Sequence, residues 1–90
     1  MNKEEIVNAV AAKTGTTKRQ AEESLEAVLD TIRDAIRDGD KVTLVGFGTF
    51  VLVERAPRKG RNPRTHEEIE IPLRKVPRFI PGKDFKQLVE

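Results

Sequence analysis

The apolar residues of the chain follow two different periods, one in each half. From residue 3 to residue 38 they recur at steps of three and four, which predicts two amphipathic helices. Gly15 is expected to end the first helix, and Gly39 the second, which spans Lys18–Asp38. Each start has the spacing of a helix cap with its capping-box partner, namely Asn2 with Glu5 and Thr17 with Gln20.

After Lys41 the pattern changes to the alternation and the Val, Thr and Phe content of β-strands. A break at Gly46-Phe47-Gly48 and a turn near residues 60–63 separate three predicted strands. Pro72 and Pro77 restrict the last strand to a sheet edge or a projecting arm. The predicted strands are about residues 41–45 and 48–58, and a returning strand that begins with the alternation of residues 67–73.

The chain ends in a predicted turn at Pro81-Gly82 and a short helix over residues 84–90. Phe85, Leu88 and Val89 are expected on one face of that helix. Two helices, a run of strands and a final helix indicate an α+β fold. The sheet is expected to be three-stranded and antiparallel, with an extended β-ribbon arm.

Ninety residues indicate a single domain with a thin core. The chain has no cysteine, so no disulfide can support that core, and pairing of two chains is the expected remedy. We predict one domain over residues 1–90. Its parts are a helical body that mediates dimerisation (1–40), a sheet with an arm (41–83, the arm about 53–75) and a C-terminal helix (84–90).

Charge is sorted along the chain, although the net charge is only +2. Residues 1–40 carry nine acids against six bases, whereas residues 55–66 carry five cations and no acid. Residues 67–72 then carry three acids, and residues 73–83 carry four cations. Such sorting favours a polyanion-binding face apart from an acidic body, although a solvated loop is the common alternative. A two-stranded ribbon with these arginines fits a DNA groove and reaches phosphates on both walls.

Pro63 lies in the predicted turn of this cationic hairpin. Asn-Pro is an ordinary turn pair, and spacing alone favours a role in shaping the turn. The other interpretation is a rigid apolar wedge that enters a base step and kinks the duplex.

Few residues offer catalytic, metal-binding or membrane chemistry. His66 is the single histidine and no cysteine is present, so we expect no enzyme, no metal site and no cofactor. All four aromatic residues are Phe, which argues against a base-stacking platform for RNA. The sequence has neither a run long enough to span a membrane nor a secretory signal, so we expect a cytoplasmic protein without a membrane partner.

Together these motifs resemble the bacterial HU and integration host factor family of histone-like DNA-binding proteins, and HU more closely. The resemblance covers essentially the whole chain and is most specific from Gly46 to Thr65. It rests on Asn2-Lys3, Gly46–Phe50, Glu54-Arg55-Ala56, Arg58–Pro63, Glu68–Pro72, Lys75-Val76-Pro77, Phe79 and Pro81-Gly82-Lys83.

The resemblance implies an intertwined dimer whose two arms embrace double-stranded DNA through the minor groove, where Pro63 wedges into a base step. It implies little sequence preference, a preference for bent, kinked or nicked DNA, and a place in the nucleoid. A homodimer is expected, with a heterodimer possible. The implied DNA-binding residues are Arg55, Arg58, Lys59, Arg61, Asn62, Pro63, Arg64, Lys3, Lys75, Lys83 and Lys86. The expected dimer core is Leu29, Ile32, Phe47, Phe50 and Phe79.

Several positions depart from the family pattern and move charge from the sheet to the arm. Val53 and Ile80 stand where an arginine and a lysine are common, and Val51 replaces a polar residue. Pro57 removes a backbone donor near the base of the arm. The remaining departures are Arg64 for a common glutamine, His66 for a common glycine, and the added cation Arg78.

Two alternative functions stay open at this point. One is a DNA bender with sequence preference, like integration host factor, which is often a heterodimer. The other is a dimeric protein-interaction scaffold in which Val51, Val53 and Ile80 form an apolar contact patch.

Overall fold

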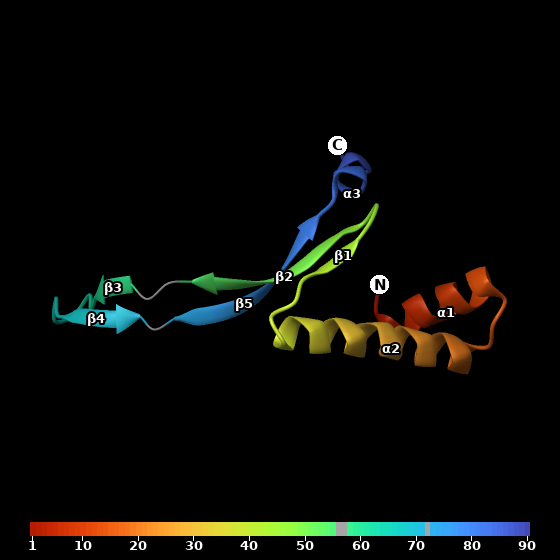
Figure 1. The fold of residues 1–90 in the computed structure, drawn as a ribbon, viewed down its shortest axis with the longest axis horizontal. Coiled ribbons are helices and arrows are strands. Elements are labelled where there is room, and N and C mark those ends of the chain that lie inside the picture. Colours follow the sequence, from red (N-terminus) through yellow and green to blue (C-terminus); the bar gives the residue numbers. More distant parts are fainter. Residues whose placement is uncertain (56–57, 72) are drawn as a thin grey trace. The chain divides into compact units, whose positions relative to one another are not determined.

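The computed structural model describes residues 1–55, 58–71 and 73–90, with the backbone alone at 58, 59, 70 and 71. The predicted α+β order is confirmed, with a helical pair followed by strands and a last short helix (Figure 1). The predicted effects of Pro57 and Pro72 fall outside the described residues. The elements are α1 (Lys3–Thr14), α2 (Lys18–Arg37), β1 (Val42–Leu44), β2 (Gly48–Arg55), β3 (Arg58–Arg61), β4 (Glu68–Ile71), β5 (Arg74–Pro81) and α3 (Lys83–Gln87).

The chain divides into two compact units, Met1–Asp34 and Ala35–Glu90. In the first unit both predicted caps are confirmed, because Asn2 Oδ1 accepts the Glu5 N–H at 2.9 Å. At the start of α2, Thr17 Oγ1 accepts the Gln20 N–H at 3.1 Å, and Gln20 Oε1 accepts the Thr17 N–H at 3.0 Å. These bonds satisfy donors that the first helical turn leaves without intrahelical partners.

The buried side chains of the first unit are small. Val7, Ala11 and Ala21 are buried, and Val10 and Leu25 pack against them. The expected core residues Leu29 and Ile32 on α2 are only half-buried in the single chain. Among the described residues, no large side chain is fully buried, so the core is as thin as the chain length predicts. No helix anywhere in the described ranges is long and apolar enough to cross a membrane.

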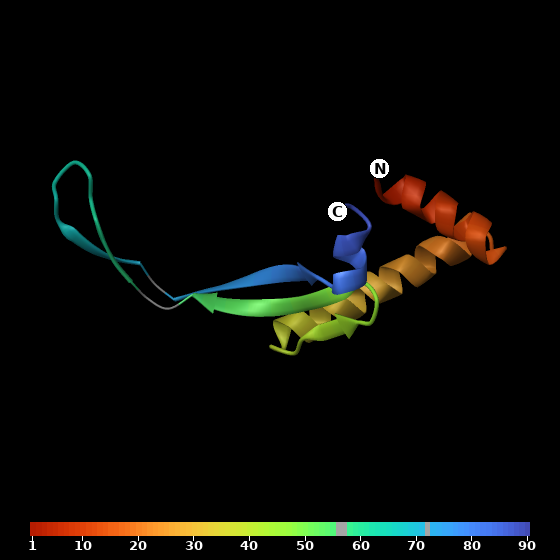
Figure 2. The same ribbon diagram turned by 90° about the horizontal axis from the view of Figure 1, so that it is seen from above.

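In the second unit, β2 is the central strand of an antiparallel sheet with the order β1-β2-β5. Figure 2 shows β2 in green between β1 and the blue strand β5. The returning strand expected from the sequence is divided into β4 and β5, and β5 lies at the sheet edge, as Pro77 indicated. It continues through Pro77, which pairs in register with Leu52. An edge strand tolerates proline because only one of its sides is paired.

Two further boundaries differ from the sequence prediction. The strand expected over 48–58 is divided, since β2 ends at Arg55 and β3 begins a separate sheet at Arg58. The prediction of a turn at Pro81-Gly82 is wrong, because Pro81 is the last residue of β5 and Gly82 is the N-cap of α3. Leu88 and Val89 lie beyond α3 and are 80% and 87% exposed, so they form no packed helix face.

The Gly46-Phe47-Gly48 segment turns the chain between β1 and β2 and positions an aromatic cluster. Gly46 has φ 83°, a left-handed conformation that favours glycine. A Cβ on Gly48 would lie 2.5 Å from Phe79 Cζ, so the close packing of this ring requires glycine. Phe79 has ring-centroid distances of 4.9 Å to Phe50, 5.3 Å to Phe47 and 6.1 Å to Phe85. Phe47 is still 42% exposed in the single chain.

Candidate nucleic-acid interface

The cationic hairpin singled out in the sequence is the β3–β4 ribbon. Its two strands are antiparallel and form a sheet of their own, separate from β1-β2-β5. The turn at the end of the ribbon holds Pro63 and Arg64, both exposed, while Asn62 is half-buried. Arg61 precedes them as the last residue of β3 and is also exposed. The ribbon therefore presents two arginines and a proline within four consecutive residues.

Asn62 holds the turn together. Its backbone carbonyl accepts the His66 N–H at 2.8 Å, and its backbone N–H donates to the Glu67 carbonyl at 2.9 Å. Its side-chain Oδ1 accepts the Arg64 N–H at 2.9 Å. This local side-chain bond is a common turn device of asparagine. Both oxygens of Asn62, the backbone carbonyl and Oδ1, are thus engaged in shaping the turn that carries Pro63.

His66 adopts a left-handed backbone conformation, with φ 59°. It is the only residue other than glycine with positive φ among those that the structure describes. Histidine is enriched in this region relative to most residues, but glycine adopts it with less strain. The turn therefore places a residue with a side chain in a conformation that favours glycine.

The returning strand places acids opposite the ribbon cations, which the sequence reading overlooked. Arg61 is opposite Glu68 in the register, and Lys59 is opposite Glu70. The register therefore pairs two cationic positions of β3 with two acidic positions of β4. The alternating acids of EEIEI were the available signal, but the register was needed to pair each acid with its cation.

A second cationic surface lies on one side of the paired strands β2 and β5. We call it the arginine–valine face, formed by Thr49, Val51, Val53 and Arg55 of β2 and Arg74, Val76, Arg78 and Ile80 of β5. The register sets Arg55 opposite Arg74 and Val53 opposite Val76. Strand alternation directs the other side chains, including Phe50 and Phe79, to the opposite side. Val51, Val53, Arg78 and Ile80, the four sheet positions noted in the sequence as departures, all fall on this one face.

The four lysines expected at the site occupy different elements. Lys3 lies on α1 and forms an ion pair with Glu26. Lys75 on β5 lies 3.6 Å from Glu54 on β2, measured from Nζ to Oε1. Lys83 and Lys86 both lie on α3 and are exposed. Because both ion pairs are solvent-exposed, they are weak enough to exchange for contacts with an anion.

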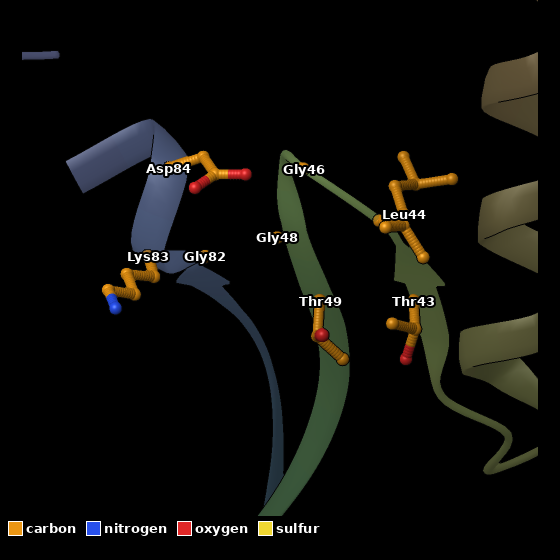
Figure 3. Close-up of a pocket in the computed structure, with 9 residues that line it drawn as sticks. Thr43, Leu44, Gly46, Gly48, Thr49, Gly82, Lys83 and Asp84 are labelled. Carbon is orange, nitrogen blue, oxygen red and sulfur yellow. The ribbon is translucent and has the colours of Figure 1, made fainter. Parts of the chain in front are cut away.

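A shallow pocket of about 270 Å³ lies between the β1–β2 turn and the start of α3. Gly46, Gly48, Gly82, Lys83 and Asp84 are among its lining residues. Figure 3 shows the Asp84 carboxylate directed toward the β1–β2 turn and the Lys83 side chain directed away from it. This arrangement does not favour a phosphate ligand. Among the described residues, no group of three metal-ligating side chains gathers at one place.

The fold, the paired ribbon and the sorted charge match a known class of proteins. The family model described as bacterial DNA-binding protein matches residues 1–90, and the chain belongs to this family. DNA-binding protein HU of Geobacillus stearothermophilus is 56% identical over 90 residues, which is 100% of both chains. DNA-binding protein HU 1 of Bacillus subtilis (strain 168) is 54% identical over 89 residues, covering 99% of this chain and 97% of the relative.

A solved structure gives the same answer for the fold. The Anabaena HU–DNA cocrystal structure is 55% identical and superimposes with a TM-score of 0.86, covering 99% of this chain and 97% of that one. The HU resemblance stated from the sequence is thereby confirmed. Membership of the bacterial DNA-binding protein family rests on a match over the whole chain. The roles of individual arginines, lysines and Pro63 remain predictions.

Proposed function

We propose that two copies of this chain form an architectural unit that binds double-stranded DNA with little sequence preference and bends it. Each β3–β4 ribbon, within an arm of about residues 53–75, enters a minor groove, and Pro63 wedges into a base step. The unit carries out no reaction and organises the DNA of the nucleoid. The observation that carries the proposal is the ribbon itself, which forms a separate sheet with Arg61, Pro63 and Arg64 exposed around its turn.

Pairing of two chains is supported by the apolar surface of one chain. Val45 is 99% exposed, and Phe47, Leu44 and Phe85 are each about two-fifths exposed. Aromatic and aliphatic side chains of this size usually contribute to a core. A second copy would cover them and join two thin cores, with Leu29, Ile32, Phe47, Phe50 and Phe79 as the proposed shared core. The similarity to HU proteins over the full chain length supports the same arrangement.

DNA contact by the proposed residues is supported by charge and by the relative of known structure. The solved Anabaena HU structure is a cocrystal with DNA, and the match to it covers 99% of this chain. We assign phosphate contacts to Arg55, Arg58, Lys59, Arg61 and Arg64 along the arm, and to Lys3, Lys75, Lys83 and Lys86 elsewhere. Asn62 shapes the turn and contacts the groove beside Pro63. Contacts to phosphates fix the position of a protein on DNA without reading bases.

Recognition of deformable DNA is the part of this proposal that an experiment tests most directly. Fluorescence anisotropy would compare an intact duplex with a nicked duplex of the same sequence across a range of salt concentrations. We expect tighter binding to the nicked duplex, because the nick lowers the cost of bending. We also expect affinity to fall steeply as salt rises, because the arms release counterions from phosphates.

The other outcomes separate the alternatives. Equal affinity for both duplexes would indicate only nonspecific electrostatic binding to a polyanion and would contradict the bending proposal. A high ratio of affinity for one sequence over random duplex would indicate a sequence-preferring bender of the integration host factor kind. Absence of binding at moderate salt, together with a recovered protein partner, would favour the interaction scaffold.

A further inference from the structure

We propose that His66 is a further DNA-contacting residue of the ribbon turn, and that it strengthens binding only when its imidazole is protonated. The inference rests on the proposed function, because it needs DNA phosphates around the turn. It deepens that function by making the affinity of the ribbon for DNA depend on pH.

His66 lies beside the position assigned to the wedge. Its backbone N–H donates to the Asn62 carbonyl at 2.8 Å, and Asn62 directly precedes Pro63. The Asn62 N–H donates in turn to the Glu67 carbonyl at 2.9 Å, so the chain closes on itself across these few residues. The His66 side chain is exposed. The short span of the turn therefore brings the imidazole close to any DNA that Pro63 contacts.

The fixed charges at this end of the ribbon cancel. Arg61 at the end of β3 and Arg64 in the turn supply two positive charges. Glu67 in the turn and Glu68 at the start of β4 supply two negative charges. Apart from His66, the other residues of the segment 61–68 are uncharged. The formal charge of the segment is therefore zero when His66 is neutral and +1 when His66 is protonated.

The balance extends beyond the turn. From residue 59 to residue 70 the chain carries three cations and three acids, and the register sets Lys59 opposite Glu70 and Arg61 opposite Glu68. An acid opposite a cation competes with a phosphate for that cation. The end of the ribbon that is proposed to enter the groove thus depends on His66 for its net positive charge.

The chemistry of histidine gives this dependence a direction. Histidine is the side chain that changes charge between pH 5 and pH 8. The negative potential of a minor groove attracts histidine as well as arginine and lysine. Phosphates near the turn favour the protonated imidazole, so binding should take up protons. Affinity should therefore rise as pH falls through the histidine range and should level off below it.

The test measures the dissociation constant of the full chain for one intact duplex at about pH 5.5 and about pH 8, by fluorescence anisotropy. Wild type should bind on the order of tenfold more tightly at the lower pH, because each protonated His66 gains a phosphate contact. The slope of log affinity against log salt should steepen by about 0.9 for each such contact. Calorimetry in two buffers with different enthalpies of ionisation should show proton uptake on binding.

Two variants at position 66 fix the charge. His66→Asn removes the titratable group but keeps a residue that tolerates a left-handed backbone, so its affinity should be nearly independent of pH. His66→Lys is a cation at both pH values and should bind more tightly than His66→Asn at both. Other titratable groups, the amino terminus included, are the same in all these proteins, so the comparison cancels their effects.

The matched control is the double variant His66→Asn/Ser24→His. It restores one imidazole per chain at an exposed position of α2, to which no DNA contact is assigned. Its affinity should stay as insensitive to pH as that of His66→Asn. A restored pH response would instead reflect the net charge of the protein and would overturn a contact in the turn.

Three other results would also overturn the inference. One is a wild-type affinity that is equal at the two pH values, and another is a pH response that His66→Asn retains. The third is a His66→Lys variant that binds no more tightly than His66→Asn, which would mean that no phosphate lies near position 66. Failure of wild type to bind the duplex at either pH would reject the proposed function itself.

Discussion

The two sheets of the second unit are stabilised in different ways. The β1-β2-β5 sheet is supported by side-chain packing, with Phe79 in contact with three other rings. The β3–β4 ribbon is supported by strand pairing and by the hydrogen bonds around Asn62. The comparison teaches that the aromatic residues needed for folding lie outside the ribbon turn that carries Arg61, Pro63 and Arg64. Substitutions should therefore separate stability from DNA binding, and four of them test this separation.

The largest effect is expected from Phe50→Ala. This change removes a ring whose centroid lies 4.9 Å from that of Phe79, and it should reduce the free energy of unfolding by ~2–5 kcal/mol. Chemical denaturation would measure the loss, and Phe50→Leu should lose much less. With pairing as proposed, the melting temperature should rise with protein concentration in both variants and in wild type. A concentration-independent melting temperature would contradict coupled folding and pairing.

Gly48→Ala tests the same sheet through overpacking. The new methyl group would lie 2.5 Å from Phe79 Cζ and 2.7 Å from the Ile80 carbonyl oxygen, so the strands must shift. We expect a loss of about 1–3 kcal/mol in the free energy of unfolding. Gly82→Ala is the matched control, because its methyl group would meet its nearest atom at 3.3 Å. Equal losses in the two variants would show that close packing on Phe79 is not the cause.

Pro63→Ala should change DNA geometry and leave stability unchanged. Pro63 is exposed in the ribbon turn, and its replacement should keep most of the affinity while it reduces bending. Energy transfer between dyes at the two ends of a duplex would measure the bend. Pro77→Ala, on β5, is the control and should preserve the transfer efficiency of wild type. Unchanged transfer in Pro63→Ala would exclude a wedge at this position.

The smallest effect is expected from His66→Gly. Glycine removes the side-chain strain at φ 59° and should stabilise the turn by less than ~1 kcal/mol. Amide hydrogen exchange at residue 66 would report this change, because its N–H bonds to the Asn62 carbonyl. His66→Ala keeps a Cβ and should exchange no more slowly than wild type. Faster exchange in His66→Gly would mean that the histidine side chain supports the turn.

Much of the fold could be predicted from local signals. The caps at Asn2 and Thr17 and the turn at Gly46 depend on neighbouring residues, so the sequence contains the information. The edge position of β5 was predictable from Pro77, whereas its separation from β4 and its pairing with β2 are properties of the whole sheet. The α3 boundary failed for a similar reason, since Phe85 is held by Phe47 while Leu88 and Val89 have no such support.

The candidate site was predictable in composition but not in pairing. The cations of the ribbon are evident in the sequence, whereas the acids opposite them follow only from the register of β3 and β4. The arginine–valine face likewise depends on which residues of β2 and β5 are opposed. Residues such as Arg55 and Arg74 are 19 positions apart in the sequence, and no local pattern brings them together.

The small core of the single chain has a consequence for its lifetime in a cell. With only Val7, Ala11 and Ala21 buried among the described apolar residues, an unpaired copy would offer Val45 and Val89 to proteases and chaperones. A marginally folded chain is removed faster than a stable one, so turnover would fall most heavily on copies without a partner. Pairing, as proposed, would then act as quality control, and the steady-state amount of the protein would depend on how quickly new copies find each other.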